Sequence, residues 1–540
     1  MNIPLKGKRV YGFGERFDAL NQAGLIRDNR VYETFTNQGA DTYMPVPFCV
    51  TDGGMGVFVD TYEPFPLSAQ DSEGGLVLSL PDQYKARIFK GSPAEILDEF
   101  TKLTGRPKLP PDWAFGLWIS ANRWNTQEII EEQTALSVHY GMKPSVVVLE
   151  AWSDEATFYL FDEKRFPDPQ GMIDGLHKQN IRLLLWQVPV LKRLEEGRVC
   201  PQHEADCAEA LENGYVVRKA DGSPYTIPGG RWFGGSMIPD FTNPRAAAWW
   251  FGKRKYLLDM GIDGFKTDGG EFVYDDDACF FDGRTGREMR NAYAAAYTKA
   301  YAGFTGDGRV LFSRAGYTGS QTTPLHWAGD QKSTWAELRH VLTAGLNAGL
   351  SGIPFWGFDI AGFAGPLPPA DLYLRGFALA CFSPVTQWHS EPPGGQFADI
   401  LAPEDGINDR SPWNIAKRAR MPEVISICRE LIEERTRLMP YILREARISA
   451  QTGRPLMSAL VVDWPDDETA AAVDDEFMFG RDLLVAPVLE EGKTGREVYL
   501  PKGRWTDHWT GEQYSGPGRI FRECGPGKIL VWNKEGRQDR

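Results

Sequence analysis

The stretch Asp263-Gly264-Phe265-Lys266-Thr267-Asp268 is a short strand-like run that closes on charged residues. A helical pattern over 243–261, opened by Asn243-Pro244, comes directly before it. An apolar strand that follows a helix within a few residues is typical of a βα unit in a parallel sheet. We therefore expect a strand here whose carboxyl end presents Asp268.

Seven further runs along the chain have the same character and alternate with helical stretches. One helix begins with the capping pattern Asn125-Thr126-Gln127-Glu128 and ends near Gly141. The runs cover residues 113–120, 145–152, 182–189, 309–315, 325–330, 354–360 and 384–389. Eight βα units in one chain predict a (β/α)8 TIM barrel of the α/β class.

The barrel is expected over 109–440, with a different pattern on each side of it. Residues 1–108 are rich in Gly, Thr, Val and Phe with turn signals, which predicts a β-sandwich-like N-terminal domain of short strands. After a helical region over 422–450 the short strands return, so we expect a C-terminal β domain over 441–540. A long insertion at about 191–239 follows the third strand, where a lid or subsite role fits the active-site face of a barrel.

The composition is that of an ordinary globular protein with an acidic balance. Across 540 residues the formal net charge is −14 and hydrophobic residues make up 42%. This charge repels phosphate, so we expect neither nucleic acid nor membrane as a partner. The 17 tryptophans suit either stacking on sugar rings or filling a large core. No signal-peptide core and no run of 18 apolar residues occurs, and the seven cysteines are scattered, which favours a cytoplasmic protein.

Acidic side chains recur at the carboxyl ends of the predicted strands, which is the functional face of a TIM barrel. The acidic residues there are Glu150, Asp268, Glu271, Asp330 and Asp359. Two carboxylates can hydrolyse a glycosidic bond when one attacks or stabilises the anomeric carbon and the other protonates the departing oxygen. The residues themselves leave open which two form that pair.

Three segments decide between these candidates. Residues 261–271 read GIDGFKTDGGE, Ser313-Arg314 precedes LHWAGD at 325–330, and 355–363 reads FWGFDIAGF. In this order they resemble the nucleophile, acid/base and strand-seven motifs of glycoside hydrolase family 31, especially its Lys-Thr-Asp subgroup. Gly12-Phe13-Gly14-Glu15 is similar to the N-terminal loop by which that family reaches its active site.

The resemblance implies a retaining mechanism with Asp268 as the nucleophile and Asp330 as the acid and then the base. The two carboxyl groups are expected to face each other across roughly 5 to 6 Å. It also implies a set of substrate-binding residues: Glu150, Trp186, Trp232, Lys266, Glu271, Arg314, Trp327, Trp356, Asp359 and His389. Within this set the four tryptophans are expected to form apolar walls, and Glu150 stands where the family usually places an aspartate.

No metal and no cofactor are implied. The segment from Cys200 to Cys207 has ligand-like spacing but offers few soft ligands, so we interpret it as an ordinary loop. Asp275-Asp276-Asp277 is interpreted as a solvated acidic loop.

The expected substrate is a small oligosaccharide or α-glycoside with a terminal α-linked sugar, and glucose is the favoured sugar. The Lys266-Thr267-Asp268 form keeps an α-xylosidase as the nearest alternative. A sulfosugar-specific enzyme is a further alternative, and a transglycosylase would use the same residues. A non-catalytic carbohydrate-binding protein is the alternative from another class. Gly269-Gly270 and Glu150 depart from the family pattern, which leaves the sugar open, and a homo-oligomer is compatible with the family.

Overall fold

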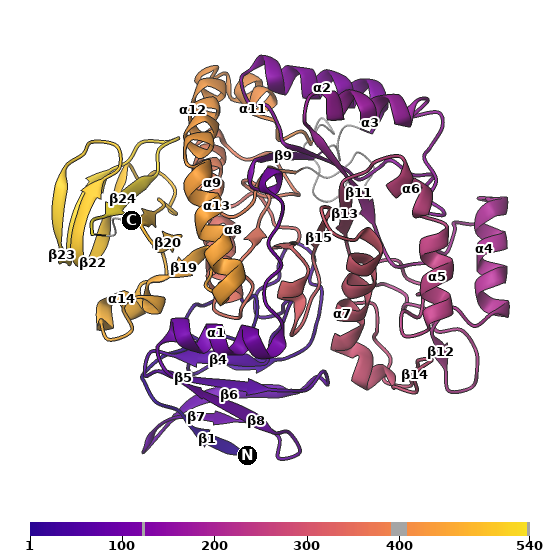
Figure 1. Cartoon of the computed structure of the whole chain (residues 1–540), viewed down its shortest axis with the longest axis horizontal. Helices are drawn as coiled ribbons and strands as arrows, with labels where there is room; N and C mark the ends of the chain where they lie inside the picture. The colour runs from indigo at the N-terminus through magenta and orange to yellow at the C-terminus, as the bar shows by residue number, and fades with distance from the viewer. Residues whose placement is uncertain (121–124, 390–407, 537–540) are drawn as a thin grey trace.

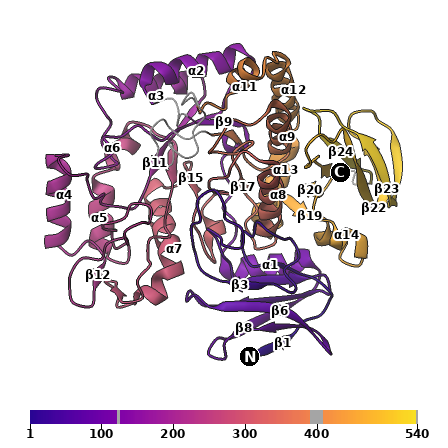
Figure 2. The ribbon, with the colours of Figure 1, turned by 180° about the vertical axis from the view of Figure 1, so that it is seen from behind.

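The computed structural model describes residues 1–120, 125–389 and 408–536, and it consists of three parts (Figures 1 and 2). Two antiparallel sheets form the N-terminal part, an eight-stranded parallel sheet with its helices forms the centre, and one antiparallel sheet closes the chain. The predicted TIM barrel with a β domain on each side is therefore confirmed. The exact domain boundaries stay a prediction.

The central sheet contains all eight predicted strands. In spatial order they are β17 (Trp356–Gly357), β16 (Leu325–Trp327), β15 (Val310–Ser313), β13 (Gly264–Thr267), β11 (Arg182–Gln187), β10 (Val146–Leu149), β9 (Leu117–Ser120) and β18 (Thr386–Trp388). A parallel bridge between Asp359 and Gln387 joins the two outermost strands, which makes the barrel nearly closed. The carboxyl ends of the strands consequently meet on one rim.

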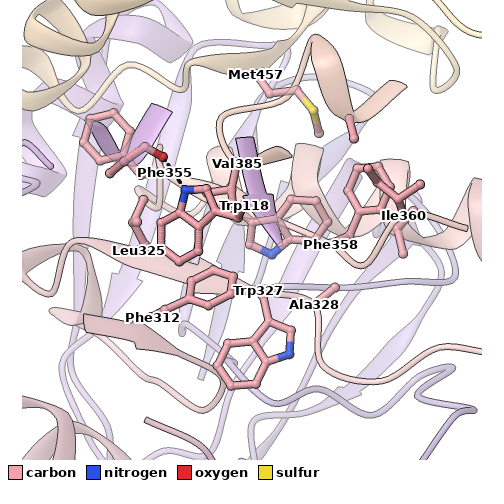
Figure 3. Packing of buried hydrophobic residues seen from close by; sticks show 14 of the residues in the cluster. Trp118, Phe312, Leu325, Trp327, Ala328, Phe355, Phe358, Ile360, Val385 and Met457 are labelled. Carbon is pink, nitrogen blue, oxygen red and sulfur yellow. Dashed lines mark hydrogen bonds between the residues drawn. The ribbon is translucent and has the colours of Figure 1, made fainter. Parts of the chain in front are cut away.

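Large aromatic side chains fill the barrel beneath this rim (Figure 3). The ring of Phe312 lies 5.0 Å from the ring of Trp118 and 5.0 Å from that of Trp327, measured between centroids. Trp118 also donates a hydrogen bond from Nε1 to the Ala114 carbonyl. These rings form a solid floor, so polar side chains in the barrel can be reached only from the rim.

Helices cover the outside of the barrel. They are α2 (Gln127–His139), α3 (Pro169–Lys178), α5 (Pro244–Gly252), α6 (Lys255–Asp259), α7 (Gly286–Thr305), α8 (Trp335–Gly349), α9 (Ala370–Cys381), α11 (Pro412–Ala419), α12 (Glu423–Arg437) and α13 (Met439–Thr452). The helix that begins after Thr126 and the helical region after Pro422 are confirmed.

The prediction of a single helix over 243–261 is wrong, because the structure has two helices there, α5 and α6. The Arg254 guanidinium donates to the Trp250 carbonyl at 3.0 Å and to Gln187 Oε1 at 2.6 Å. The Arg254 amide therefore bonds the Phe251 carbonyl instead, which tightens the turn and breaks the α-helical pattern.

Two four-stranded sheets and one helix form the N-terminal part. One sheet pairs β1 (Asn2–Pro4), β7 (Gly75–Ser79), β6 (Pro66–Ser72) and β3 (Ile26–Asp28); the other pairs β2 (Val10–Gly12), β4 (Phe48–Thr51), β5 (Met55–Val59) and β8 (Ala86–Lys90). Helix α1 (Pro93–Thr104) was not expected, although Ser92 and Glu95 form a capping box at its start.

The insertion after β11 contains a helix of its own, α4 (Pro201–Glu212), and a short strand β12 (Arg218–Lys219) that pairs with β14 (Ala278–Cys279). The interpretation of the segment from Cys200 to Cys207 as a loop is therefore wrong. Pro201 at the first helical position has no amide hydrogen to satisfy and a fixed φ, which favours a helix start. The tip of the insertion returns toward the rim.

The C-terminal sheet has the strand order β19 (Met457–Ala459), β20 (Phe477–Phe479), β21 (Leu483–Ala486), β24 (Leu530–Lys534), β22 (Gly495–Asp507) and β23 (Gln513–Glu523). A short helix α14 (Glu468–Ala472) lies between the first two strands. Helix α13 (Met439–Thr452) runs continuously across residue 441, where the C-terminal domain was predicted to begin. No helix among the described residues has the length and apolar character needed to cross a membrane.

Candidate active site

Arg314, directly after β15, joins the carboxylates at the rim. Its Nε lies 3.2 Å from Asp268 Oδ1, its Nη1 lies 3.8 Å from Asp330 Oδ2, and its Nη2 contacts the carboxylate of Glu271. The guanidinium side chain is only 1% exposed, and the surrounding carboxylates outweigh its burial and raise its pKa. The two predicted catalytic carboxylates are therefore held on one fixed cation.

Asp268 follows the last residue of β13 and accepts two hydrogen bonds. Trp186 Nε1 donates to Oδ2 at 2.9 Å, and the Gly269 amide donates to Oδ1 at 2.8 Å. Gly269 has φ +74°, and a Cβ there would stand 2.6 Å from the Phe272 ring, so glycine is needed to aim this amide. Two hydrogen-bond donors and the Arg314 guanidinium thus surround the carboxylate oxygens of Asp268 and fix their orientation, as a nucleophile requires.

Asp330 lies in a different environment. Burial raises its pKa well above the usual range, with a further increase from Asp268, against the opposing charges of Arg314 and Lys266. No donor from the described residues makes a hydrogen bond to its carboxylate. Gly329 before it has φ +73°, and a Cβ there would lie 2.3 Å from the Tyr43 ring, so only glycine lets that ring pack beside Asp330. Asp330 is thus poised to carry a proton.

Asp268 and Asp330 differ from Glu271 in the exposed fraction of their side chains. The side chains of Asp268 and Asp330 are 12% and 15% exposed, whereas that of Glu271 is completely buried behind Arg314. Glu271 was predicted to bind substrate, but the structure places it where it contacts Arg314 instead. It positions the guanidinium, and burial raises its own pKa.

A second charged cluster lies deeper in the barrel, around Glu150 after β10. Glu150 Oε1 contacts Lys266 Nζ and lies 2.7 Å from His389 Nε2. Lys266 Nζ also lies 3.1 Å from His389 Nε2, so these three side chains all contact one another. Burial alone would raise the pKa of Glu150, but the adjacent His389 and Lys266 outweigh burial and lower this pKa to about 2. Glu150 is therefore an anion at neutral pH.

Asp359 and Trp327 complete the inner wall. Asp359 Oδ1 accepts a hydrogen bond from Gln387 Nε2 at 2.8 Å, while Oδ2 is buried without a partner among the described residues. The Trp327 ring lies under Lys266, whose Nζ is 4.4 Å from its centroid, and the indole Nε1 also has no described partner. A buried acceptor and a buried donor next to one cation suit a ligand that carries hydroxyl groups.

Trp186 and Trp232 lie together at the mouth of the site. Their ring centroids are 6.4 Å apart at an interplanar angle of 61°, and Trp232 comes from the tip of the insertion. The Trp232 ring also covers Arg314, with the guanidinium carbon 4.9 Å from its centroid. The insertion thus contributes directly to the site, as a lid or subsite would.

The structure does not bring Trp356 into this cluster. Trp356 pairs in register with His326 rather than with Trp327, so it points to the outer face of the barrel. Its ring packs against Gly345 of α8, and its Nε1 donates to Glu15 Oε1 at 2.6 Å. Its prediction as a substrate wall is therefore corrected to a packing residue.

Two residues of the N-terminal part reach Arg314 that the sequence did not reveal. Glu33 Oε1 lies 3.4 Å from Arg314 Nη2, and the Tyr43 ring centroid lies 4.7 Å from the guanidinium carbon. Burial raises the pKa of Glu33 to about 7, against the charge of Arg314. The loop at Gly12-Phe13-Gly14-Glu15 contacts the end of α8, where the Gly12 amide donates to Asn347 Oδ1 at 3.4 Å and the Gly14 amide donates to Ser351 Oγ, two residues beyond the helix, at 2.8 Å. No local pattern around Glu33 or Tyr43 signals these contacts.

Metal ligands do not converge here. Over residues 1–120, 125–389 and 408–536, no group of three or more His, Cys, Asp or Glu side chains has the arrangement of a metal site. The segment Asp275-Asp276-Asp277 lies in the connection between β13 and β14.

A parallel (β/α)8 barrel with paired carboxylates, a shared arginine and tryptophans at its rim defines the class of carbohydrate-active hydrolases. Models of one glycosyl hydrolase family match most of the chain. Residues 107–445 match the glycosyl hydrolases family 31 TIM-barrel domain, 453–537 its C-terminal domain, and 5–65 its N-terminal galactose mutarotase-like domain. The chain belongs to glycosyl hydrolase family 31.

Three known relatives illustrate what the chain is similar to. An isomaltosyltransferase from Sporosarcina globispora is 37% identical over 98% of this chain, which spans 51% of that relative. A 1,3-alpha-isomaltosidase from Kribbella flavida is 37% identical over 94% of the chain and is covered to 73%. The structure of a cycloalternan-degrading enzyme from Trueperella pyogenes in complex with a covalent intermediate superposes with a TM-score of 0.93 at 38% identity, covering 99% of this chain and 77% of that one.

Proposed function

We propose that this protein is a retaining α-glycosidase that acts on α-glucan oligosaccharides, with Asp268 as nucleophile and Asp330 as general acid and base. One observation carries the proposal: both carboxylates lie on the Arg314 guanidinium, but Asp268 receives two hydrogen bonds while burial raises the pKa of Asp330. A carboxylate held by hydrogen-bond donors suits the nucleophile, and a carboxyl group whose pKa is raised by burial suits the acid.

Both reaction steps follow from this division. In the first, Asp330 gives its proton to the glycosidic oxygen as the bond to the anomeric carbon breaks, and a carboxylate oxygen of Asp268 forms a new bond to that carbon. In the second, Asp330, now ionised, takes a proton from water while the water oxygen displaces Asp268. Two inversions retain the anomeric configuration. Arg314 stays fixed and balances the negative charge that moves between the two carboxylates.

We propose an isomaltosyl unit as the group released, in place of the single glucose that the sequence suggested. Two relatives at 37% identity are named for isomaltosyl chemistry, whereas an α-glucosidase and an α-xylosidase among the relatives are 28% and 30% identical. Transfer is a second candidate, because one of the two is named a transferase.

A substrate panel tests the released unit. p-Nitrophenyl α-isomaltoside is expected to react at least tenfold faster, in kcat/KM, than the α-glucoside, α-xyloside or α-sulfoquinovoside, because differential binding of a second sugar contributes to transition-state stabilisation. Chromatography of products from an isomaltosyl-(1→3)-oligosaccharide then separates hydrolysis, which gives isomaltose, from transfer, which gives longer or cyclic saccharides. Release of glucose alone from every substrate would contradict the isomaltosyl assignment.

Lys266 offers a test of the electrostatics. Its positive charge lowers the pKa of Asp330, so Lys266→Met is expected to move the alkaline limb of the kcat/KM profile, where Asp330 loses its proton, to higher pH. Because the variant leaves Glu150 buried with one partner fewer, the free energy of unfolding should fall by about 3 kcal/mol or more. Denaturant titration measures the second effect. Lys255→Met on the surface of α6 is the control for both, and a limb that moves to lower pH contradicts the assignment of Asp330 as the acid.

A further inference from the structure

One segment of the N-terminal part, residues 29–33, is held on the barrel by buried polar side chains. Asn291, within α7, donates from Nδ2 to the Asn29 carbonyl at 2.7 Å, and its Oδ1 accepts from the Val31 amide at 2.8 Å. The Asn29 side chain in turn donates to the Tyr317 hydroxyl, and all four residues are buried. Figures 1 and 2 show the N-terminal sheets next to α7. The position of this segment on the barrel is therefore fixed from two sides.

This anchorage brings Glu33 onto the guanidinium of Arg314. Glu33 Oε1 lies 3.4 Å from Nη2, and the same nitrogen contacts the carboxylate of Glu271. A guanidinium Nη carries two hydrogens, so two carboxylates can share it. The other nitrogens face the catalytic pair, with Nε 3.2 Å from Asp268 Oδ1 and Nη1 3.8 Å from Asp330 Oδ2. One nitrogen thus contacts the two glutamates, and the other two contact the two aspartates.

The charges in this group do not balance when every carboxyl group is ionised. Four carboxylates would then surround one guanidinium in a site whose side chains are at most 15% exposed. Buried charges without a partner are costly, so such groups take up protons. Asp330 holds one proton as the acid of the proposed reaction. The two glutamates hold the rest of the excess, because among the described residues no cation other than Arg314 lies within ion-pair distance of either one.

The two glutamates differ in their access to water. Burial raises the pKa of Glu33 to about 7, with further increases from Glu271 and Asp268, against the charges of Arg314 and Arg231. The Glu33 side chain is 12% exposed, so it can exchange a proton with water, whereas Glu271 is completely buried and burial raises its pKa as well. Below neutral pH the pair therefore holds a proton, which Glu33 releases as the pH rises.

Arg231, Tyr43 and Tyr274 also interact electrostatically with Glu33, and none of them titrates near neutral pH. Arg231 lies between the rings of Tyr32 and Tyr274, with its guanidinium carbon 4.9 Å and 5.0 Å from their centroids, and a guanidinium keeps its charge. Burial raises the pKa of Tyr43 and of Tyr274, so both hydroxyl groups stay neutral. The charge around Arg314 on this side of the site consequently changes through the glutamate pair.

From these contacts we infer that Glu33 is a positioning residue for the proposed reaction. With Glu271 it holds one proton and one nitrogen of Arg314, and it thereby keeps the rest of the guanidinium on the catalytic pair. The inference rests on the proposed function, because it takes Asp268 and Asp330 as the nucleophile and the acid. When Glu33 loses its proton to water, one more negative charge lies on the shared guanidinium and stabilises the proton of the acid. The N-terminal part thereby helps to set the pH range of activity.

The pH profile tests this charge. Glu33→Gln keeps the length of the side chain and an acceptor oxygen but cannot ionise. The alkaline limb of its kcat/KM profile is expected to move to lower pH by about half a unit or more, because the negative charge that stabilises the proton of Asp330 is missing. Glu73→Gln, in the exposed turn between β6 and β7, is the matched control and should leave the limb in place. A limb that stays in place in Glu33→Gln, or moves to higher pH, overturns the role of Glu33.

Glu33→Ala separates positioning from sugar binding. Arg314 Nη2 loses one of its two partners, so kcat is expected to fall about tenfold, the effect of losing a charged hydrogen-bond partner, while KM changes less than threefold. The loss should be equal for a p-nitrophenyl α-glycoside and an isomaltosyl-containing tetrasaccharide, because both react beside the same guanidinium. Glu33→Gln should recover most of this loss below pH 6, and Asn291→Ala, which releases the segment, should reproduce it. A loss confined to KM or to the tetrasaccharide would make Glu33 a sugar contact and overturn the inference.

Unfolding separates this inference from the proposed function. A carboxyl group whose pKa is raised by folding stabilises the folded state below its unfolded pKa, and this contribution is lost as the pH rises through the folded pKa, here about 7. Between pH 5 and pH 8 the denaturant midpoint of the wild type should therefore fall more than that of Glu33→Gln. Equal falls overturn the shared proton. If the wild type cleaves no α-glycoside while this difference is present, the proposed function fails and the protonated glutamate pair remains.

Discussion

Replacing Asp268 with alanine is expected to lower kcat for every α-glycoside by about four to six orders of magnitude, the loss seen when a covalent nucleophile is removed from a hydrolase. The side chain that forms the bond to the anomeric carbon is gone, while Trp186, Gly269 and Arg314 keep their places around the vacated space. Substrate affinity should therefore change far less than turnover. Steady-state kinetics and saccharide titration measure the two quantities separately.

Azide gives this prediction a stereochemical readout. In Asp268→Ala an azide ion can occupy the space of the lost carboxylate and attack the anomeric carbon directly, while Asp330 still protonates the leaving group. One inversion then produces a β-glycosyl azide, which proton NMR identifies. The surface variant Asp259→Ala should retain wild-type turnover and give no azide product. An Asp268→Ala enzyme that keeps more than about one per cent of the wild-type kcat would remove Asp268 from the mechanism.

Asp330→Ala is expected to show a loss that depends on the leaving group. With an oligosaccharide, whose departing oxygen needs a proton, kcat/KM should fall by about two to four orders of magnitude, the contribution of general acid catalysis. With a p-nitrophenyl glycoside the departing phenolate is stable without that proton, so the glycosyl-enzyme still forms. Its hydrolysis is then slow, because the variant has no base at residue 330 to take a proton from the attacking water. A burst of p-nitrophenol followed by slow turnover is the expected time course.

The pH profile and azide separate Asp330 from Asp268. Burial raises the pKa of Asp330, and the acid is active when protonated, so wild-type activity should fall as the pH rises through this elevated pKa. Asp330→Ala should lack that alkaline limb. Azide should accelerate its second step without needing a base and give an α-glycosyl azide by two inversions, opposite to the product from Asp268→Ala. An unchanged alkaline limb in the variant would assign the acid to another group.

Much of the architecture could be predicted because it depends on local pattern. Each barrel strand is a short apolar run next to a helix, and the eight runs all became strands, from 113–120 through 384–389. Asp268 could be located for the same reason, since the residue that follows a barrel strand must lie at the rim. The helix start before α2 was equally local, and Thr126 caps it by accepting a hydrogen bond from the Ile129 amide.

The errors fall where a remote contact overrides the local pattern. The segment 243–261 has helical periodicity throughout, but Arg254 bonds Gln187 on β11 and takes a carbonyl that its own backbone amide would otherwise use. The aromatic character of Trp356 suggested a binding wall, but the pairing register between β16 and β17 turns it outward. A one-residue change of register moves a side chain to the other face of a sheet, and the sequence of one strand does not state that register.

What the sequence alone determined is therefore the barrel, its flanking β domains and the strand end at which Asp268 lies, because helices and strands follow from periodicities within a few residues. Only the tertiary structure decided that Asp268, Asp330, Glu271 and Glu33 share one guanidinium, and that Tyr32 and Tyr274 hold Arg231 between them. Tyr32 and Glu33 come from the N-terminal part of the chain, whereas the other residues come from the barrel and its insertion. Their meeting depends on how the domains pack and on the closure of long loops, and no local preference of the chain encodes it.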